Sequence, residues 1–265
     1  MKEQQHRELH RQMTMVTAVA YDLRDPAAVI LVAKDALEKL VISQLSEKEQ
    51  KKAQTPLKYI EKSVDRLERI SMNLLDISRC STGAMEPHWE AVCISQVCQE
   101  VCKEAKELRQ GRNIVCTLPK NPVMIQTDSY FFDRILLNLL SNAMVACPEG
   151  KISVDLKEYP EEVVLVVKDN GPGMDAERLK TPFAPVYRTE DSSVKLGLYV
   201  SDLLAKQMQA TLTAENMPKG GARFILRIPI MPNKGQQAFF APSLRQGQQA
   251  RKRYIKAEFS LFDGM

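Results

Sequence analysis

The most informative stretch of this sequence is residues 167–174, Val167-Lys-Asp169-Asn-Gly171-Pro-Gly173-Met174. The apolar run before it ends at an aspartate, so the pattern predicts a strand that brings a carboxylate to a loop. The two glycines lack a Cβ and leave room for a ligand beside the backbone. The Asp169 carboxylate can accept a hydrogen bond from an exocyclic amine such as that of adenine. A plain Asp-Gly turn has the same composition, so this stretch needs support from the rest of the chain.

A pair of asparagines occurs earlier in the chain, in Asn138-Leu-Leu-Ser-Asn142-Ala143. The amphipathic pattern of residues 129–146 predicts a helix, and positions four apart lie on one helix face. Both amide oxygens can therefore point at one hard cation, and Mg²⁺ prefers oxygen ligands. Taken alone, such a pair is more often a solvated helix face than a metal site.

Two further glycine-containing stretches follow. The first is Lys195-Leu-Gly197-Leu198, at the start of a helix predicted over 196–209. Free N–H groups at a helix N-terminus can hold phosphate. A simple loop-to-helix junction explains this stretch equally well when it is taken alone. The second, Gly220-Gly221-Ala-Arg-Phe224, predicts a tight turn into the last strand.

The segments around these stretches predict one mixed sheet covered by helices. A helix is expected at 95–108, and strands are expected at 113–118, 123–127, 151–159, 162–168, 211–215 and 223–230. Together they predict an α/β sandwich over residues 87–231, with the helices on one face of the sheet. The chain from 232 to 265 is rich in Gln, Gly, Lys and Arg, which favours a disordered tail.

The N-terminal part, residues 1–80, has a helical pattern. Apolar or small residues recur at steps of four and three over 16–41 and again over 57–77, which indicates two helices with heptad seams. We expect a polar turn at 46–55 between them, with Pro56 near the first turn of the second helix. A lone hairpin exposes its seam, so two copies should pair into a four-helix bundle, and the chain should be a homodimer. The predicted fold class is therefore α+β, a helical hairpin followed by the sandwich.

Composition excludes several other classes of protein. The 265 residues are 44% hydrophobic and 26% charged, as in ordinary globular domains, and the net charge of +4 is too small to indicate nucleic-acid binding. No stretch reaches the roughly 18 apolar residues that a membrane span requires, so we expect a cytoplasmic protein without a membrane partner. The six cysteines include no CxxC pair, and we expect buried reduced thiols rather than disulfides or a metal site.

The order and spacing of the four stretches resemble the nucleotide-binding boxes of the GHKL ATPase superfamily. With the helical hairpin in front, the chain resembles sensor histidine kinases from about residue 14 to residue 230. The resemblance implies ATP and Mg²⁺ as ligands. It implies that Asn142 binds the metal with help from Asn138, and that Asp169 recognises the adenine amine. Gly171 and Gly173 would let the nucleotide lie flat.

The resemblance also implies roles near the phosphates and a class of partner. Gly197 and Leu198 would present backbone N–H groups to phosphate, residues 189–194 would form a flexible lid, and Arg188 would reach the γ-phosphate. The partners it implies are a response-regulator receiver domain or a partner kinase.

The first helix departs from the family at the phosphoacceptor. The family has a box resembling His-Glu-Leu-Arg-Thr-Pro, and here the matching residues are Tyr21-Asp22-Leu23-Arg24-Asp25-Pro26. Tyr21 thus stands in the place of the histidine, and Asp22 matches the acidic neighbour that acts as a base. Imidazole, with an ordinary pKa of about 6.5, offers a nitrogen lone pair at neutral pH. A tyrosine hydroxyl stays protonated and is a poor nucleophile without activation, so ordinary phosphorelay chemistry is not expected here.

Three functions fit this sequence. The first is phosphotransfer from ATP in a two-component pathway, with a degenerate acceptor site. The second is a catalytically inactive dimeric pseudokinase that binds ATP as a conformational ligand and regulates a response regulator or another kinase. The third is an anti-sigma-type serine kinase, a group that shares the ATP domain but generally lacks the hairpin.

Overall fold

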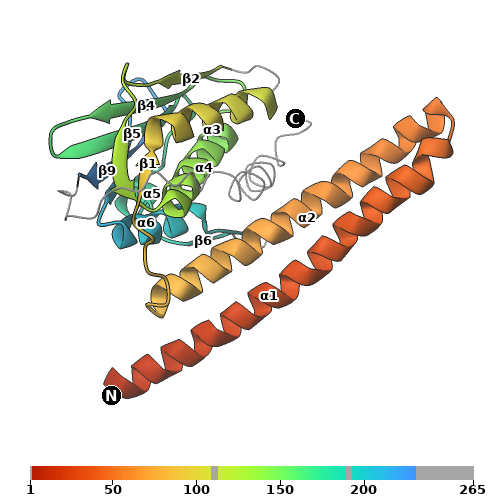
Figure 1. Cartoon of the computed structure of the whole chain (residues 1–265), viewed down its shortest axis with the longest axis horizontal. Coiled ribbons are helices and arrows are strands. Elements are labelled where there is room, and N and C mark those ends of the chain that lie inside the picture. Colours follow the sequence, from red (N-terminus) through yellow and green to blue (C-terminus); the bar gives the residue numbers. More distant parts are fainter. Residues whose placement is uncertain (1, 109–112, 189–192, 231–265) are drawn as a thin grey trace. The chain divides into compact units, whose positions relative to one another are not determined.

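The computed structural model describes residues 2–108, 113–188 and 193–230. These residues form two compact units, which meet in the sequence between Met85 and Glu86 (Figure 1). The first unit is a helical hairpin and the second is an α/β sandwich, so the predicted fold class is confirmed. The segment 232–265, where a tail was predicted, lies outside the described residues. No helix among the described residues has both the length and the apolar character needed to cross a bilayer.

The hairpin consists of α1 (Lys2–Leu40), the short 3₁₀ helix η1 (Ile42–Gln44) and α2 (Glu47–Ser81). The polar turn predicted at 46–55 is wrong, because α2 begins directly after Ser46. Ser46 forms a capping box with Glu49, and the Glu-, Lys- and Gln-rich residues that follow are good helix formers. Pro56 therefore lies inside α2 rather than near its first turn.

Small and polar residues join the two helices of the hairpin. Ala20 and Ala27 on α1 are fully buried, as is Ser71 on α2. The Ser71 hydroxyl donates a hydrogen bond of 2.6 Å to the backbone carbonyl of Ala20. Beyond Ala27 the predicted seam of α1 is more open, since Ile30 is 41% and Leu37 is 50% exposed.

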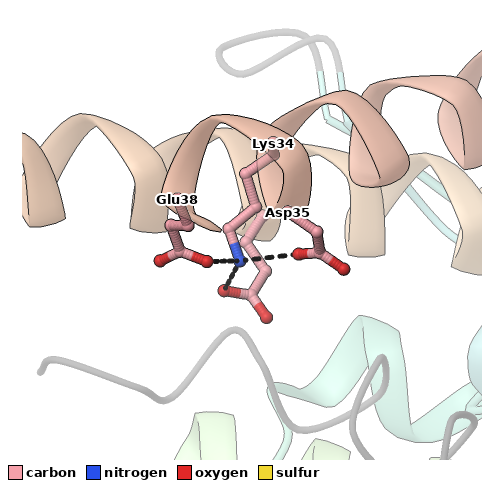
Figure 2. A network of polar contacts seen from close by, with 4 residues as sticks. Lys34, Asp35 and Glu38 are labelled. Carbon is pink, nitrogen blue, oxygen red and sulfur yellow. Dashed lines mark hydrogen bonds and ion pairs between the residues drawn. The ribbon is translucent and has the colours of Figure 1, made fainter. Parts of the chain in front are cut away.

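A lysine occupies one position of the predicted seam. The Lys34 ammonium lies 3.2 Å from Glu38 on α1, 3.5 Å from Asp35 and 3.4 Å from Glu61 on α2 (Figure 2). Burial alone would lower the pKa of Lys34, but the hydrogen bonds and charges of Glu38 and Glu61 outweigh it, and the pKa is raised. Lys34 therefore keeps its charge and links α1 to α2 electrostatically.

The second unit contains a five-stranded sheet. Its strands, in spatial order, are β2 (Ile114–Thr117), β4 (Ile152–Glu158), β5 (Glu162–Asp169), β9 (Ala222–Pro229) and β8 (Thr211–Asn216). β2 pairs in parallel with β4, and the other neighbours are antiparallel.

Three helices cover this sheet: α3 (Ile94–Leu108), α4 (Ser129–Ala146) and α6 (Gly197–Gln207). α3 packs against β2 and β4, whereas α4 packs against β5 and α6 (Figure 1). The core between the layers is apolar, with Phe132, Leu139, Leu165 and Leu226 fully buried. α4 starts at a fixed point because the Asp128 carboxylate accepts a hydrogen bond from the backbone N–H of Phe131 at 3.0 Å.

Smaller elements complete the unit. β1 (Glu90–Cys93) pairs antiparallel with β3 (Met124–Thr127), so the strand predicted at 123–127 exists but belongs to a separate two-stranded sheet. α5 (Ala176–Lys180) follows the glycine loop after β5. β6 (Val186–Arg188) pairs with β7 (Ser193–Lys195).

Candidate functional site

Asp169 is the last residue of β5, and its side chain is buried at 2% exposure. One carboxylate oxygen, Oδ1, accepts hydrogen bonds from the backbone N–H groups of Gly171 at 2.9 Å and Ala222 at 3.3 Å. The other oxygen, Oδ2, is buried and has no hydrogen-bond partner within the described part of the chain. The strand end therefore holds one carboxylate oxygen in place and leaves the second available to a donor.

The pKa of Asp169 also indicates that its carboxylate lacks a hydrogen-bond donor. Burial raises the pKa of its carboxyl group, and the hydrogen bonds from Gly171 and Ala222 offset this only in part. A buried polar atom without a partner costs free energy, so it is uncommon in a folded protein unless a ligand or water supplies the missing bond. This site calls for a hydrogen-bond donor at Oδ2, which an exocyclic amine can provide.

Two glycines leave no space for a side chain next to Asp169. A Cβ on Gly171 would lie 2.6 Å from the carbonyl oxygen of Ala146, at the end of α4. Gly221 has a φ of +91°, and a Cβ there would lie 2.0 Å from the carbonyl oxygen of Asp169. The loop after β5 and the turn before β9 therefore approach Asp169 with bare backbone on both sides.

The third glycine, Gly173, is fixed by a residue far away in the sequence. It has a φ of +78°, and a Cβ there would lie 2.9 Å from Oδ1 of Asn216. The Asn216 amide also brackets the next residue, because its Oδ1 accepts from the Met174 N–H at 2.8 Å and its Nδ2 donates to the Met174 carbonyl at 2.7 Å. This two-sided contact holds the glycine loop against the end of β8.

Asn138 connects α4 to α6. Its Nδ2 donates to the Gly197 carbonyl at 3.1 Å and to the Ser201 hydroxyl at 3.2 Å. Its Oδ1 is buried without a hydrogen-bond partner among the described residues. A Cβ on Gly197 would lie 3.4 Å from this oxygen, which is ordinary van der Waals contact. Asn142 lies one turn further along α4 and is partly exposed.

The start of α6 offers backbone donors. Gly197 is its first residue, and the preceding residue, Leu196, makes no side-chain cap. The first hydrogen bond of the helix runs from the Val200 N–H to the Leu196 carbonyl at 2.9 Å. The N–H groups of Gly197 and Leu198 come before it in the chain, so they are the ones that a helix leaves for an anion.

The remaining predicted residues are placed as follows. Arg188 ends β6, but its side chain is outside the description, as are residues 189–192 of the predicted lid. Tyr21 and Asp22 lie on α1 in the other unit, and both are exposed. The Tyr21 hydroxyl accepts a hydrogen bond of 2.9 Å from Nη2 of Arg79 on α2.

Sequence reasoning missed three contributors to the site: the Ala222 N–H, Ser201 and Asn216. Ser201 lies one helical turn after Gly197, and its hydroxyl donates to the Gly197 carbonyl at 2.9 Å, which a helix pattern could have suggested. No local signal marks Asn216, because its contact joins segments that meet only in the folded sheet.

Comparison with known proteins finds sequences and structures that are similar to this chain. Residues 127–232 match the family model described as histidine kinase-, DNA gyrase B- and HSP90-like ATPase. Sensor protein KdpD of Escherichia coli (strain K12) is 29% identical over 222 residues, which are 81% of this chain and 24% of that protein. Sensor histidine kinase ZraS of Klebsiella oxytoca is 32% identical over 180 residues, or 66% of this chain and 37% of that protein. Residues 127–232 therefore form a histidine kinase-like ATPase domain.

Solved structures agree with this histidine kinase-like fold over both units. Full-length ShkA in complex with AMPPNP superposes with a TM-score of 0.67 at 19% identity, covering 92% of this chain and 54% of that one. Acinetobacter baumannii histidine kinase AdeS gives 0.58 at 18% identity, covering 80% and 98%. The kinase-like chain spans 15% to 25% of the length of the first four curated relatives it matches.

Proposed function

We propose that the α/β unit of this histidine kinase-like chain binds ATP together with Mg²⁺. The observation that carries the proposal is Oδ2 of Asp169, a buried carboxylate oxygen without a described partner beside a glycine loop that excludes side chains. Adenine presents an exocyclic amine, which is the kind of donor that this oxygen lacks. Gly171 and Gly173 would let the nucleotide lie flat against the backbone, and their missing Cβ atoms make way for Ala146 and Asn216.

The phosphate end of the site is formed by α4 and α6. Asn142 would hold Mg²⁺, assisted by Asn138, whose Oδ1 is buried without a described partner. Neutral amide ligands suit a metal that keeps several waters and takes its remaining ligands from phosphates. When bound, the metal would neutralise phosphate charge. Gly197 and Leu198 would donate backbone N–H groups to phosphate, and Arg188 would reach the γ-phosphate.

The contact at Tyr21 bears on what happens to bound ATP. A hydroxyl becomes a nucleophile when a base accepts its proton. Arg79 instead donates a hydrogen bond to the Tyr21 oxygen. Asp22 is the next residue on the same helix, and adjacent helical residues do not face each other. Among the described contacts no base accepts the Tyr21 proton, and this favours a pseudokinase that uses ATP as a conformational ligand over phosphotransfer to a degenerate acceptor. The hairpin argues against the anti-sigma-type serine kinase.

A homodimer and a signalling partner belong to this proposal. On α1, Val29, Val32 and Leu40 are 67%, 70% and 68% exposed in the single chain, so a second hairpin would remove a continuous apolar surface from water. Histidine kinase ThkA has been crystallised in complex with response regulator protein TrrA, and that structure matches this one with a TM-score of 0.56 at 21% identity, covering 88% of this chain and 67% of that one. A response-regulator receiver domain or a partner kinase is therefore the proposed binding partner of the hairpin.

Incubation with γ-labelled ATP tests the proposal. We expect no acid-labile label on the unmodified chain, acid-labile label on Tyr21→His, and none on the double variant Tyr21→His/Asp169→Asn. Acid-labile label on the unmodified chain would refute the pseudokinase role. Acid-stable label that disappears in Tyr21→Phe would establish phosphotransfer to the tyrosine instead.

A further inference from the structure

The loop between β5 and α5 depends on side chains for its shape. The backbone of residues 170–174 makes no hydrogen bond with any other backbone group that the structure describes. A segment without backbone bonds has many conformations in water, and ordering it costs conformational free energy. If nothing held this loop in the free protein, a ligand that lies against it would have to supply that free energy on binding.

The start of the loop is held by Asn170. Its Oδ1 accepts a hydrogen bond from the Cys147 thiol at 2.7 Å and a second from the Lys151 N–H at 2.8 Å. Gly150 makes room for both contacts, because a Cβ there would lie 2.0 Å from Sγ of Cys147 and 2.1 Å from Oδ1 of Asn170. Asn170 therefore fastens the loop to the segment that follows α4.

The end of the loop is held by Asn216, the last residue of β8. Both ends of its amide are used, since Oδ1 accepts from the Met174 N–H and Nδ2 donates to the Met174 carbonyl. Asn216 and Asn170 are both exposed. Neither side chain belongs to the apolar core, so the hydrogen bonds to and from the loop are the contacts that these side chains provide.

We propose that Asn170 and Asn216 are positioning residues that hold residues 170–174 in the shape that receives the nucleotide. This inference rests on the proposed function and deepens it. Both side chains act on the backbone beside Gly171 and Gly173 and not on the nucleotide itself. Loss of either anchor therefore lowers nucleotide affinity and leaves the sheet and its helices folded.

The geometry predicts opposite results for the same substitution at the two positions. Asn170 is only an acceptor in the contacts above, and a carboxylate also accepts, so Asn170→Asp should keep both hydrogen bonds. Asn216 also donates, which an ionised carboxylate cannot do, so Asn216→Asp should place an oxygen against the Met174 carbonyl oxygen. Protonation of that carboxyl group restores a donor. The affinity of Asn216→Asp should therefore recover as pH falls toward the ordinary aspartate pKa of about 3.9.

Calorimetric titration of the purified full chain with Mg²⁺–ATP, from about pH 7.5 down to about pH 5, tests both anchors. Each affinity is expressed relative to the unmodified chain at the same pH, which removes the titration of ATP and of Asp169. At the higher pH, binding should weaken by about 5- to 30-fold in Asn170→Ala, Asn216→Ala and Asn216→Asp, whereas Asn170→Asp should stay within about threefold. At the lower pH, the deficit of Asn216→Asp should shrink and that of Asn216→Ala should stay constant.

Glu162→Gln is the matched control, because it breaks an ion pair with Arg227, 2.6 Å away, at the opposite end of β5. It should leave nucleotide affinity unchanged, and circular dichroism should show every variant to be folded at the temperature of the titration. Without nucleotide, amide hydrogen exchange at Met174 should be faster in Asn216→Ala than in Asn216→Asp, which keeps the acceptor.

Three results would overturn the inference. Equal nucleotide affinity in the unmodified chain and both alanine variants would refute it and leave the proposed function standing. Equal losses in Asn170→Asp and Asn216→Asp at every pH would also refute it, because any change of these side chains would then perturb the site. Absence of binding by the unmodified chain would refute the proposed function and this inference together.

Discussion

Asp169→Asn separates the cost of burying this carboxylate from its benefit to nucleotide binding. The substitution keeps the shape of the side chain but can place an NH₂ donor where Oδ2 now faces the expected amine. A hydrogen bond to a charged group contributes about 1.5–3 kcal/mol. At about 1.4 kcal/mol per tenfold, we predict that affinity for Mg²⁺–ATP falls by about 10- to 150-fold.

The same substitution should have the opposite effect on the nucleotide-free protein. Burial raises the folded-state pKa of Asp169. An acid whose pKa is raised on folding adds stability below its unfolded pKa and loses that contribution as pH rises through the folded pKa. At neutral pH the ionised carboxylate is therefore a cost that Asn removes, so the melting temperature without nucleotide should be equal or higher.

Asp155→Asn is the matched control for this experiment. Although burial alone would raise the pKa of Asp155, its hydrogen bonds, chiefly with Lys168, lower it. Its stabilisation is present above the unfolded pKa, so Asp155→Asn should lower the melting temperature at neutral pH and leave nucleotide affinity unchanged. Thermal denaturation with and without Mg²⁺–ATP measures both quantities. Unchanged ATP affinity in Asp169→Asn, or a melting temperature that falls as in Asp155→Asn, would refute the reasoning.

Three other substitutions give further predictions. Gly221→Ala should lower the free energy of unfolding, measured by urea titration, by more than about 2 kcal/mol, because a positive φ costs about 1–2 kcal/mol and the new Cβ would meet the Asp169 carbonyl. Gly83→Ala is the control, since Gly83 has a φ of +68° but open space around it, and it should lose only the conformational part. Equal losses in the two variants would contradict the reasoning. Lys34→Met should lower the free energy of unfolding by about 1 kcal/mol. Because the pKa of Lys34 is raised on folding, the ion pairs stabilise the fold only while the lysine is charged, so the difference should stay constant below the ordinary lysine pKa of 10.5 and shrink above it. A difference that does not change with pH would count against the ion pairs. Asn138→Ala should lower the free energy of unfolding by about 1–3 kcal/mol, because it removes both hydrogen bonds to α6. Amide hydrogen exchange should then become faster in α6 than in β4, and a uniform increase over both elements would contradict this prediction.

Much of the fold follows from local pattern. The alternation of apolar residues in β4 and the apolar run of β5 predicted the two strands, and the seam positions predicted a helical hairpin. The predicted turn of that hairpin is misplaced because residues 47–55 have the polar composition of a loop although they form the start of α2. The signal that locates the helix start is the capping box of Ser46 and Glu49, which depends on two side chains and not on hydrophobicity.

The site was predictable where its parts are close in the sequence. The link from Asp169 to Gly171 spans two residues, so the motif itself implies it. The contact of Asn216 with Met174 depends on how β8 ends beside the loop, which no local pattern encodes. The expectation of buried thiols is confirmed for Cys98, Cys102 and Cys147 and is wrong for Cys80, Cys93 and Cys116, which are partly exposed.

Calorimetric titration of the purified, folded chain with ATP in the presence of MgCl₂ tests most directly whether the site at the ends of β5 and α4 binds nucleotide. The account predicts saturable heat with one nucleotide per chain, weakened in Asp169→Asn and preserved in Asp155→Asn. Absence of any binding heat at millimolar ATP, while circular dichroism shows the chain to be folded, would contradict it.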